Sequence, residues 1–440
     1  MVPCAQQLQL PTAPLHTLRQ AGRIPLRRPH RRSGRTIAAM ISASASSGTP
    51  NPVVLGCGGI SVDYLATVAS FPNPDDKIRS LALKVQGGGN TGNALTAAAR
   101  LGLRPRIISK VANDAQGRSI LNELQSDGVD TSYILVAENG NSAFSYIIVD
   151  EQTKTRTCIH TPGSPPMVPE ELTKANLSSA LDGADIVYFD VRLHDTALLV
   201  AEEASQRKIP ILVDAERKRE GLDELLNFAS YVVCSAKFPQ AWTGASSTPV
   251  ALVSMLSRLP NIKFVIVTLG EKGCLMLERS MTDASEAGEI DAEALFESLE
   301  KKVDRSSNIP KCIASKPNLR IRADGVVSIS GRLLLGTAEV IPPGELVDTT
   351  GAGDAFIGAV LYASQLPFLK SVVSSEAISF LCYADIMVYA LACHQRGCCL
   401  LLHKWLVAVA EVWGLEAAFP IAQIHAWLAI DLNSAGLHPV

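Results

Sequence analysis

The chain has 440 residues, of which 47% are hydrophobic and 19% charged, and its formal net charge is −3. This composition excludes an intrinsically disordered, collagenous or disulfide-scaffold protein, and the near-neutral charge argues against nucleic-acid binding through a basic face. The length allows one large α/β domain or two to three average domains.

The first fifty residues differ from the rest in charge. They contain seven arginines but no lysine, and the first acidic residue is Asp63. The other 33 basic residues stand against all 43 acidic residues, so the chain beyond position 50 carries a net charge of −10. An Arg-rich, acid-free leader that runs into the small residues of 42–48 is typical of an organellar transit peptide. We therefore expect residues 1–50 to be a disordered transit peptide for the plastid stroma, with the mitochondrion as the alternative. A basic tail that touches RNA or anionic lipid is the competing interpretation.

From Pro52 onward, short apolar runs rich in β-branched residues alternate with helical periods. Strands are predicted at 53–55, 106–111, 186–189, 211–214, 231–234 and 264–268. Helices are predicted between many of them, at 93–101, 169–181, 195–207 and 250–259. Continuous apolar strands joined by helices predict a mostly parallel sheet covered on both faces.

Two segments interrupt this rhythm. The runs 144–149 and 155–160 alternate more strongly and are joined by a polar turn, so they predict a hairpin that serves as a lid. Residues 281–325 form an acidic, polar insertion with one amphipathic helix through Ile290, Leu295, Leu299 and Val303. We interpret this insertion as a solvated surface excursion without chemistry.

The strongest chemical motif is the string from Asp348 to Asp354, which reads DTTGAGD. Gly351, Ala352 and Gly353 allow several backbone N–H groups to converge, and the apolar run 355–361 then begins a helix. Small residues that open a helix form an anion hole, because unpaired amides and the positive helix end both favour phosphate oxygens. Asp354 in the first turn can accept a hydroxyl proton as a general base, although it can also simply cap the helix.

A glycine-rich turn at 87–93 is the second motif. Gly88 and Gly89 bring the backbone close to a ligand, and the side chains of Asn90 and Asn93 offer the donors and acceptors that sugar hydroxyls need. This turn lacks the lysine and Ser/Thr of a P-loop. Upstream of it, Gly56-Cys57-Gly58 could begin a dinucleotide-binding fingerprint, but Ser61 occupies the position of its third glycine, so dinucleotide binding is disfavoured.

The third feature is Asp63, with Asp75 and Asp76 shortly beyond it. We expect Asp63 just past the end of the first strand, where a carboxylate can accept two hydroxyls of a polyol. A loop residue without a function is the alternative.

Together these residues resemble the ribokinase/PfkB family of carbohydrate kinases from about Val53 to Ala363. The DTTGAGD string is similar to the C-terminal signature of that family, and GGNTGNALTAAARLG to its N-terminal one. Within the family the chain looks most like the ketohexokinases. The shared features are Asp63, the stretch 75–79, the Asn90 and Asn93 pair, and Arg156-Thr157.

The resemblance implies a ribokinase-like three-layer α/β/α sandwich within residues 51–363, with lid strands at about 78–86 and 144–160. It implies ATP-dependent phosphorylation of a small sugar, which is a ketose, ribose or a related polyol, with Mg²⁺ and with Asp354 as general base. The amides of Gly351, Ala352 and Gly353 would hold the transferred phosphoryl group. Nucleotide contacts would come from Arg156, Thr268, Gly270 and Gly273, and sugar contacts from Asp63, Asp75, Gly88, Gly89, Asn90 and Asn93.

The partners expected from this resemblance are few. We expect a small-molecule sugar substrate, no nucleic acid, no membrane, no metal-ligating side chains and a homodimer through the lid strands. A non-catalytic kinase-fold scaffold or regulatory protein of the organelle is the alternative.

The family's N-x-x-E motif is replaced by Ser235-Ala236-Lys237-Phe238, and ketohexokinases lack it too.

The tail at 364–440 departs most from the family. Residues 366–440 contain 8 charged residues, three of the four tryptophans and four of the ten cysteines. Its apolar runs are interrupted by polar residues, so no clean membrane span is expected, and its Cys and His spacing matches no standard zinc site. Back-translation of 403–429 with permitted codons, read one base earlier, can give an Ala- and Gly-rich string that resembles the family ending. We therefore hypothesise that 364–397 is intron read-through and that 398–440 is out of frame.

Overall fold

The core of the protein is a large sheet whose strands are joined mainly by helices. The computed structural model describes residues 51–153, 155–280, 289–306, 310–338, 340 and 350–365. The strands of the large sheet are β1 (Val53–Cys57), β4 (Arg104–Ala112), β5 (Asp130–Ala137), β8 (Ile186–Phe189), β9 (Ile211–Ala215), β10 (Tyr231–Cys234), β11 (Phe264–Thr268), β12 (Cys274–Arg279), β13 (Glu289–Asp291), β14 (Cys312–Ala314), β15 (Leu319–Ala323) and β16 (Val326–Gly336). All six strands predicted for the parallel sheet are therefore confirmed.

The strand order places the first strand in the middle of this sheet. The order is β13-β15-β16-β12-β11-β10-β9-β8-β1-β4-β5, with β14 beside β16. β1 pairs in parallel with both β4 and β8. The chain moves from β1 to β4 and β5 on one side, and from β8 through β9, β10 and β11 on the other. The point where the direction reverses lies between β1 and β8, and open parallel sheets bind their ligands at such a point.

Helices cover both faces of the large sheet. One face packs against α2 (Asn90–Arg100), α3 (Ala115–Ser126) and α10 (Ala352–Gln365). The other packs against α4 (Lys174–Leu181), α5 (His194–Gln206), α6 (Leu222–Phe228), α7 (Phe238–Thr243), α8 (Thr248–Arg258) and α9 (Ala292–Glu300), while η1 (Pro169–Glu171) and η2 (Gly270–Lys272) are single turns. In β1, Val54 belongs to the first cluster, whereas Leu55 and Cys57 belong to the second, as strand alternation requires. The expected three-layer α/β/α sandwich is confirmed.

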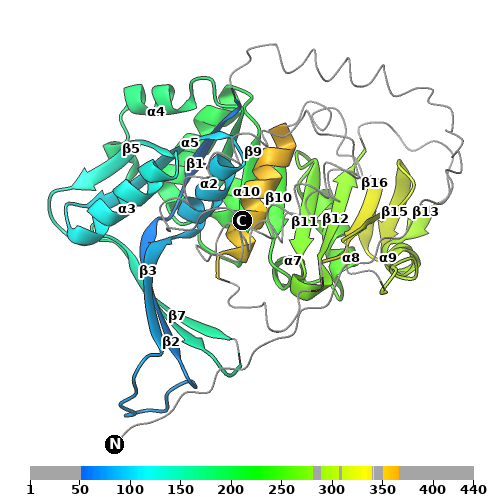
Figure 1. Cartoon of the computed structure of the whole chain (residues 1–440). Coiled ribbons are helices and arrows are strands. Elements are labelled where there is room, and N and C mark those ends of the chain that lie inside the picture. Colours follow the sequence, from blue (N-terminus) through cyan, green and yellow to red (C-terminus); the bar gives the residue numbers. More distant parts are fainter. Residues whose placement is uncertain are drawn as a thin grey trace, which may run out of the picture. The chain divides into compact units, whose positions relative to one another are not determined.

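A close helix crossing determines where the two conspicuous motifs meet. At Gly358 of α10, a Cβ atom would lie 2.6 Å from the Ala97 Cβ and 2.8 Å from the Ala94 carbonyl oxygen of α2. Only glycine allows the two backbones to approach this closely. α2 and α10 therefore lie side by side (Figure 1).

A separate four-stranded sheet forms the lid, in the order β3-β2-β6-β7. Its strands are β2 (Ser61–Val68), β3 (Ala82–Gly88), β6 (Phe144–Asp150) and β7 (Arg156–Thr161), and the sheet projects from the large one (Figure 1). The predicted hairpin is β6–β7. The strand predicted at about 78–86 is β3, which begins at residue 82. The expected position of Asp63 in a loop after the first strand is wrong, because Asp63 lies within β2.

The interpretation of the insertion as a solvated excursion is also wrong. Its helix exists as α9, and Leu295 and Leu299 are buried in the large core cluster. β13, β14 and β15 extend the large sheet beyond β16. The apolar face of α9 gains free energy by covering these added strands, so a segment that is acidic overall still folds onto the sheet.

Among the described helices, none combines the length and hydrophobicity that crossing a membrane requires. The predicted transit peptide and almost all of the atypical tail lie outside the described residues, so both stay predictions.

Candidate active site

Polar side chains gather at the carboxyl ends of β1 and β8, where the strand order reverses. Asp190 follows β8 directly, and its Oδ2 accepts hydrogen bonds from the backbone N–H of Gly59 at 2.8 Å and of Thr91 at 3.1 Å. At Gly58, a Cβ atom would lie 2.2 Å from the Asp190 carboxylate, so the turn after β1 must be glycine. Asp190 thus ties the end of β8, the turn after β1 and the start of α2 together.

Asp354 meets α2 at the same place. The Asn93 Nδ2 donates a hydrogen bond of 2.7 Å to Asp354 Oδ2. Burial raises the pKa of Asp354 to about 7, and the charges of Asp190 and Glu216 add to this rise, whereas the Asn93 hydrogen bond and Arg192 oppose it. A carboxylate with a pKa near neutrality is suited to proton transfer, because it can both take and release a proton at working pH.

The start of α10 has the backbone conformation expected of an anion hole. Gly351 has a φ of +78°, and its carbonyl oxygen accepts from Ala355 N–H at 3.0 Å, so it forms the first turn before Asp354. A Cβ at Gly353 would meet nothing within 4 Å, so its surroundings are open. The structure therefore brings Gly351, Ala352 and Gly353 together with Asp354 and Asn93.

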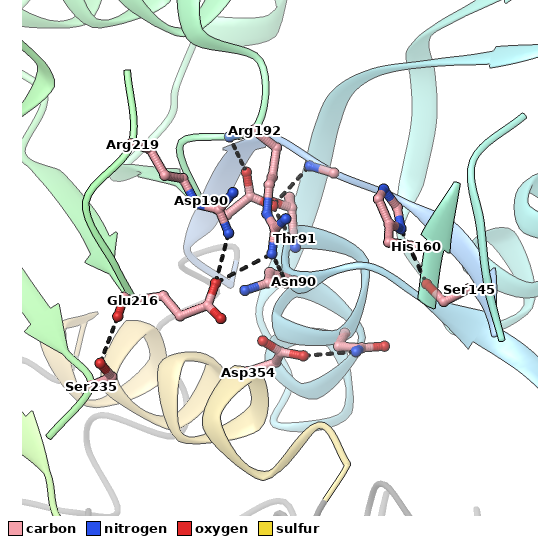
Figure 2. Close-up of polar contacts among 12 residues, drawn as sticks. Asn90, Thr91, Ser145, His160, Asp190, Arg192, Glu216, Arg219, Ser235 and Asp354 are labelled. Atoms are coloured by element: carbon pink, nitrogen blue, oxygen red, sulfur yellow. Dashed lines mark hydrogen bonds and ion pairs between the residues drawn. The ribbon is translucent and has the colours of Figure 1, made fainter. Parts of the chain in front are cut away.

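A network of charges that the sequence did not indicate surrounds Asn90. Arg192 Nη2 donates to Asn90 Oδ1 at 3.2 Å and to Glu216 Oε2 at 3.2 Å, and Arg219 Nη2 donates to the same Glu216 oxygen at 2.9 Å (Figure 2). Asn90 also hydrogen bonds to Asp214, whose pKa is raised well above its usual value by burial and by repulsion from Asp354, Glu216 and Asp190. Burial alone would raise the pKa of Glu216, but the Arg219 hydrogen bond and the arginine charges hold it below its usual value.

The two missed aspartates share one pattern. Asp190 follows the predicted strand 186–189 directly, and Asp214 ends the predicted strand 211–214. In a parallel sheet the carboxyl ends of neighbouring strands meet at one edge, so an acidic residue at a strand end was the available indication. Arg192 and Arg219 carried no such pattern, since nothing local distinguishes them from surface arginines.

The lid supplies the predicted sugar-binding carboxylate. Asp63 is buried, and a Cβ at Gly88 would lie 2.3 Å from its carboxyl carbon, so glycine is required there. Burial raises the pKa of Asp63, hydrogen bonds from Ser145 and Ser61 oppose the rise, and the charge of Glu123 adds to it. Gly89 has a φ of +87°, and a Cβ there would lie 2.6 Å from the Gly59 carbonyl oxygen. Gly88 and Gly89 thus join the lid to the start of α2.

Two predicted residues of the lid lie farther away. Asp75 is exposed in the loop between β2 and β3, at the end of the lid opposite Asp63, with a φ of +67°. Arg156 opens β7 and pairs in register with Val149, four residues along the strand from His160. At about 3.3 Å per residue this separation is about 13 Å. Both residues therefore lie toward the end of the lid that is far from Asp63 and His160.

The predicted nucleotide residues lie at the carboxyl end of β11. Thr268 Oγ1 donates to the Cys234 carbonyl oxygen of neighbouring β10 at 3.2 Å. Gly270 begins η2. Gly273 has a φ of +85°, and a Cβ atom there would lie 2.0 Å from the Gly336 carbonyl oxygen, so only glycine fits. Since β11 is parallel to β10 and β10 to β9, this turn lies at the same sheet edge as Glu216.

A cavity of about 230 Å³ lies beside α2 and α3 and is lined by Asn93, the hydrogen-bond partner of Asp354. Asn93 and Gly351 line one part of it, Ser61 and Gly88 another, and the ion pair of Arg100 with Asp127 a third. Within the described ranges, no group of three or more His, Cys, Asp or Glu side chains is placed to hold a metal ion.

Comparisons with known proteins agree with this geometry. A family model described as pfkB family carbohydrate kinase matches residues 54–295. Ribokinase of Staphylococcus aureus is 24% identical over 247 residues, which is 55% of this chain and 80% of that protein. Ketohexokinase of Mus musculus is 22% identical over 334 residues, which is 75% of this chain and 93% of that protein. The solved structure of Arabidopsis thaliana ribokinase, complexed with ribose and ATP, has a TM-score of 0.53 at 18% identity and covers 79% of this chain and 94% of that one. At this identity the structural likeness shows the fold.

Proposed function

Because the chain belongs to the pfkB family of carbohydrate kinases, we propose that it transfers the terminal phosphoryl group of ATP to a hydroxyl of a small sugar, with Asp354 as the general base. The observation that carries the proposal is the 2.7 Å hydrogen bond from Asn93 to Asp354 in the first turn of α10. It places an oriented carboxylate beside a helix N-terminus, at the switch point of the sheet.

The chemistry follows from this geometry. Asn93 holds Asp354 Oδ2, which leaves Oδ1 to accept the proton of the sugar hydroxyl. As that proton moves to Asp354, the hydroxyl oxygen forms a bond to the terminal phosphorus, and the bond to the ADP oxygen breaks. The amides of Gly351, Ala352 and Gly353 stabilise the negative charge on the transferred group, because they and the helix dipole point toward it.

For the nucleotide we propose the turn at Thr268, Gly270 and Gly273, with Arg156 reaching the phosphates when the lid moves. The A. thaliana ribokinase of the same fold was solved in complex with ATP, which supports ATP as the nucleotide. Mg²⁺ is expected to accompany the ATP phosphates, as phosphoryl transfer generally requires. No step of the proposed reaction is assigned to Mg²⁺.

For the sugar we propose Asp63, Gly88, Gly89, Asn90 and Asn93, with Asp75 joining them if the lid loop folds inward. Carboxylates and amides together accept from and donate to vicinal hydroxyls. A ketose, ribose or a related polyol fits these groups. The ketohexokinase-like assignment within the family is part of this proposal, and the ribokinases and ketohexokinase that match the chain have comparable identities.

The test is a kinase assay with purified protein, ATP, Mg²⁺ and a panel of neutral ketoses, aldoses and polyols. Turnover on one class, with loss of at least about a hundredfold in Asp354→Asn, is expected from a general base. Asn is close in size to Asp, so the variant should keep the melting temperature of the wild type. A folded protein that turns over no sugar would instead favour the non-catalytic scaffold.

We further propose that two copies associate through the outer face of the lid. Leu83, Val85, Tyr146 and Ile159 point away from Asp63 and are 65%, 52%, 53% and 54% exposed. Tyr64, Phe144 and Tyr146 form an aromatic group on the same face. A contiguous apolar face of this kind commonly marks an interface.

Residues 1–50 are proposed to direct the chain to the plastid stroma, with the mitochondrion as the alternative, on the basis of their arginines and lack of acids. A fusion of residues 1–50 to a fluorescent protein should enter one of these organelles, and a cytosolic fusion would contradict the proposal.

The hypothesis about the tail is tested by transcript sequencing, which should show a spliced form that lacks 364–397 and changes frame after it. A single continuous coding transcript would contradict that hypothesis.

A further inference from the structure

A row of polar side chains crosses the inner face of the lid. Asp63 of β2 lies in register with Ser145 of β6, and Ser145 lies in register with His160 of β7. Residues in register on neighbouring strands point to the same face of a sheet, so all three side chains lie on one face. Asp63 and Ser145 are buried, whereas His160 is exposed. None of the roles proposed above uses Ser145 or His160.

Hydrogen bonding along this row orients the imidazole. Ser145 Oγ and His160 Nδ1 are 3.2 Å apart (Figure 2). On its other side Ser145 lies in register with Asp63, and hydrogen bonding from its hydroxyl favours the ionised form of Asp63 and opposes the rise in its pKa. An ionised carboxylate can only accept, and a hydroxyl has one hydrogen to donate. The Ser145 hydrogen therefore goes to Asp63, and Nδ1 of His160 must carry a hydrogen that it donates to Ser145. The imidazole Nε2 is then a free acceptor, unless the ring is protonated.

The charges around His160 oppose protonation. Although the side chain is exposed overall, partial desolvation of the ring lowers the pKa of His160, and the positive charges of Arg192, Arg219 and Arg217 lower it further. Those three arginines are the charged groups that face it from the large sheet, and Asp63 acts on it from the lid through Ser145. Within the described part of the chain, Nε2 has no hydrogen-bond partner.

We propose that His160 is a specificity-determining residue of the sugar site, whose Nε2 accepts a hydrogen bond from a hydroxyl of the acceptor while Nδ1 is held by Ser145. This inference rests on the proposed sugar kinase function and adds a residue to its substrate side. The group that binds Nε2 is a neutral hydroxyl that donates a hydrogen bond, because the lone pair of this nitrogen repels the oxygens of a carboxylate or phosphate. Ser145 connects His160 to Asp63, so polar side chains of β2, β6 and β7 lie beside one another across the lid.

Kinetics with two amide variants separate the two ring nitrogens. Asparagine places its amide nitrogen near Nδ1 and can keep the bond to Ser145, whereas glutamine reaches the position of Nε2. With the sugar that gives turnover in the panel, His160→Asn should raise KM for the sugar about tenfold, the effect of one lost hydrogen bond, with kcat and KM for ATP within about twofold. His160→Gln should restore most of the affinity. Thr157→Ala, on the opposite face of β7, is the matched control. An unchanged sugar KM in His160→Asn, or a fall in kcat alone, would overturn the proposal.

A second measurement does not depend on turnover. Two-bond ¹H–¹⁵N NMR spectra of the full chain report the tautomer of each histidine, and His160→Asn assigns the signal. The wild type should show the Nδ1–H form at neutral pH, and Ser145→Ala should shift the ring toward the more usual Nε2–H form. An Nε2–H ring in the wild type would refute the inference even if the protein phosphorylates sugars. The expected tautomer without any turnover would instead leave the His160 arrangement standing and reject the kinase function.

Discussion

The hydrogen bond from Asn93 to Asp354 sets the pH at which the proposed general base ionises. The base works only when deprotonated, so kcat/KM should rise with pH and reach half its plateau near pH 7, the pKa of Asp354. The 2.7 Å bond favours the ionised form and therefore lowers this pKa. Asn93→Ala removes that stabilisation and should move the half-maximal pH upward.

The size of the shift follows from the strength of the bond. A hydrogen bond to a charged group contributes about 1.5–3 kcal/mol, and 1.36 kcal/mol corresponds to one pKa unit. Asp354 keeps some solvent exposure, so the lower end applies, and the half-maximal pH should move to about 8. At pH 7 the ionised fraction then falls about fivefold. A further loss at all pH values is expected from the sugar contact that we propose for Asn93.

The assay is a kcat/KM profile between pH 5.5 and 9.5 for the wild type, Asn93→Ala and Thr96→Ala. Thr96 lies one turn further along α2 and bonds to Asp127 rather than to Asp354, so its variant should leave the profile unmoved. An Asn93→Ala profile that is lower at every pH but keeps its midpoint would refute the role assigned to this bond.

Three further substitutions test the charges, the helix crossing and the lid. Glu216→Gln removes a negative charge that raises the pKa of Asp354, so the midpoint of the same pH profile should fall below that of the wild type, and a rise would contradict the charge assignment. Gly358→Val inserts atoms where even a Cβ would lie 2.6 Å from Ala97, so denaturant unfolding should show a loss of about 1–3 kcal/mol or more, and an unchanged midpoint would show that α2 and α10 are not so closely packed. Tyr146→Glu places a charge on the outer face of the lid and should convert the dimer into a monomer in light scattering, whereas a monomeric wild type would reject the proposed dimer.

The strands and the glycine-rich motif that ends at Asp354 were predictable because their patterns are local. The runs 186–189 and 264–267 consist of apolar and aromatic residues, as strands buried on both faces require, and the strands appear with the predicted bounds 186–189 and 264–268. The string that ends at Asp354 predicted a helix start with an acidic first turn, which α10 has. Asp63 was placed wrongly, because 61–68 is not a continuously apolar run and yet forms the strand β2.

The insertion shows a different limit. Its acidic composition predicted a solvated segment, yet β13, β14 and β15 join the large sheet and α9 buries Leu295 and Leu299. A few apolar side chains on one face decide whether a segment packs, and an average over 45 residues conceals them.

Taken by itself, the sequence determined the fold class, the α/β alternation, the anion-hole motif and the two asparagines of α2, since each is written in neighbouring residues. Only the tertiary structure decided that Asp190, Arg192 and Glu216 surround these residues, and that Ser145 joins Asp63 to His160. The physical reason is that periodicity and turn chemistry act over a few residues, whereas strand order and register result from packing of the whole core. Groups that lie 131 positions apart in the chain, as Gly59 and Asp190 do, meet only because β1 and β8 are neighbours in the sheet.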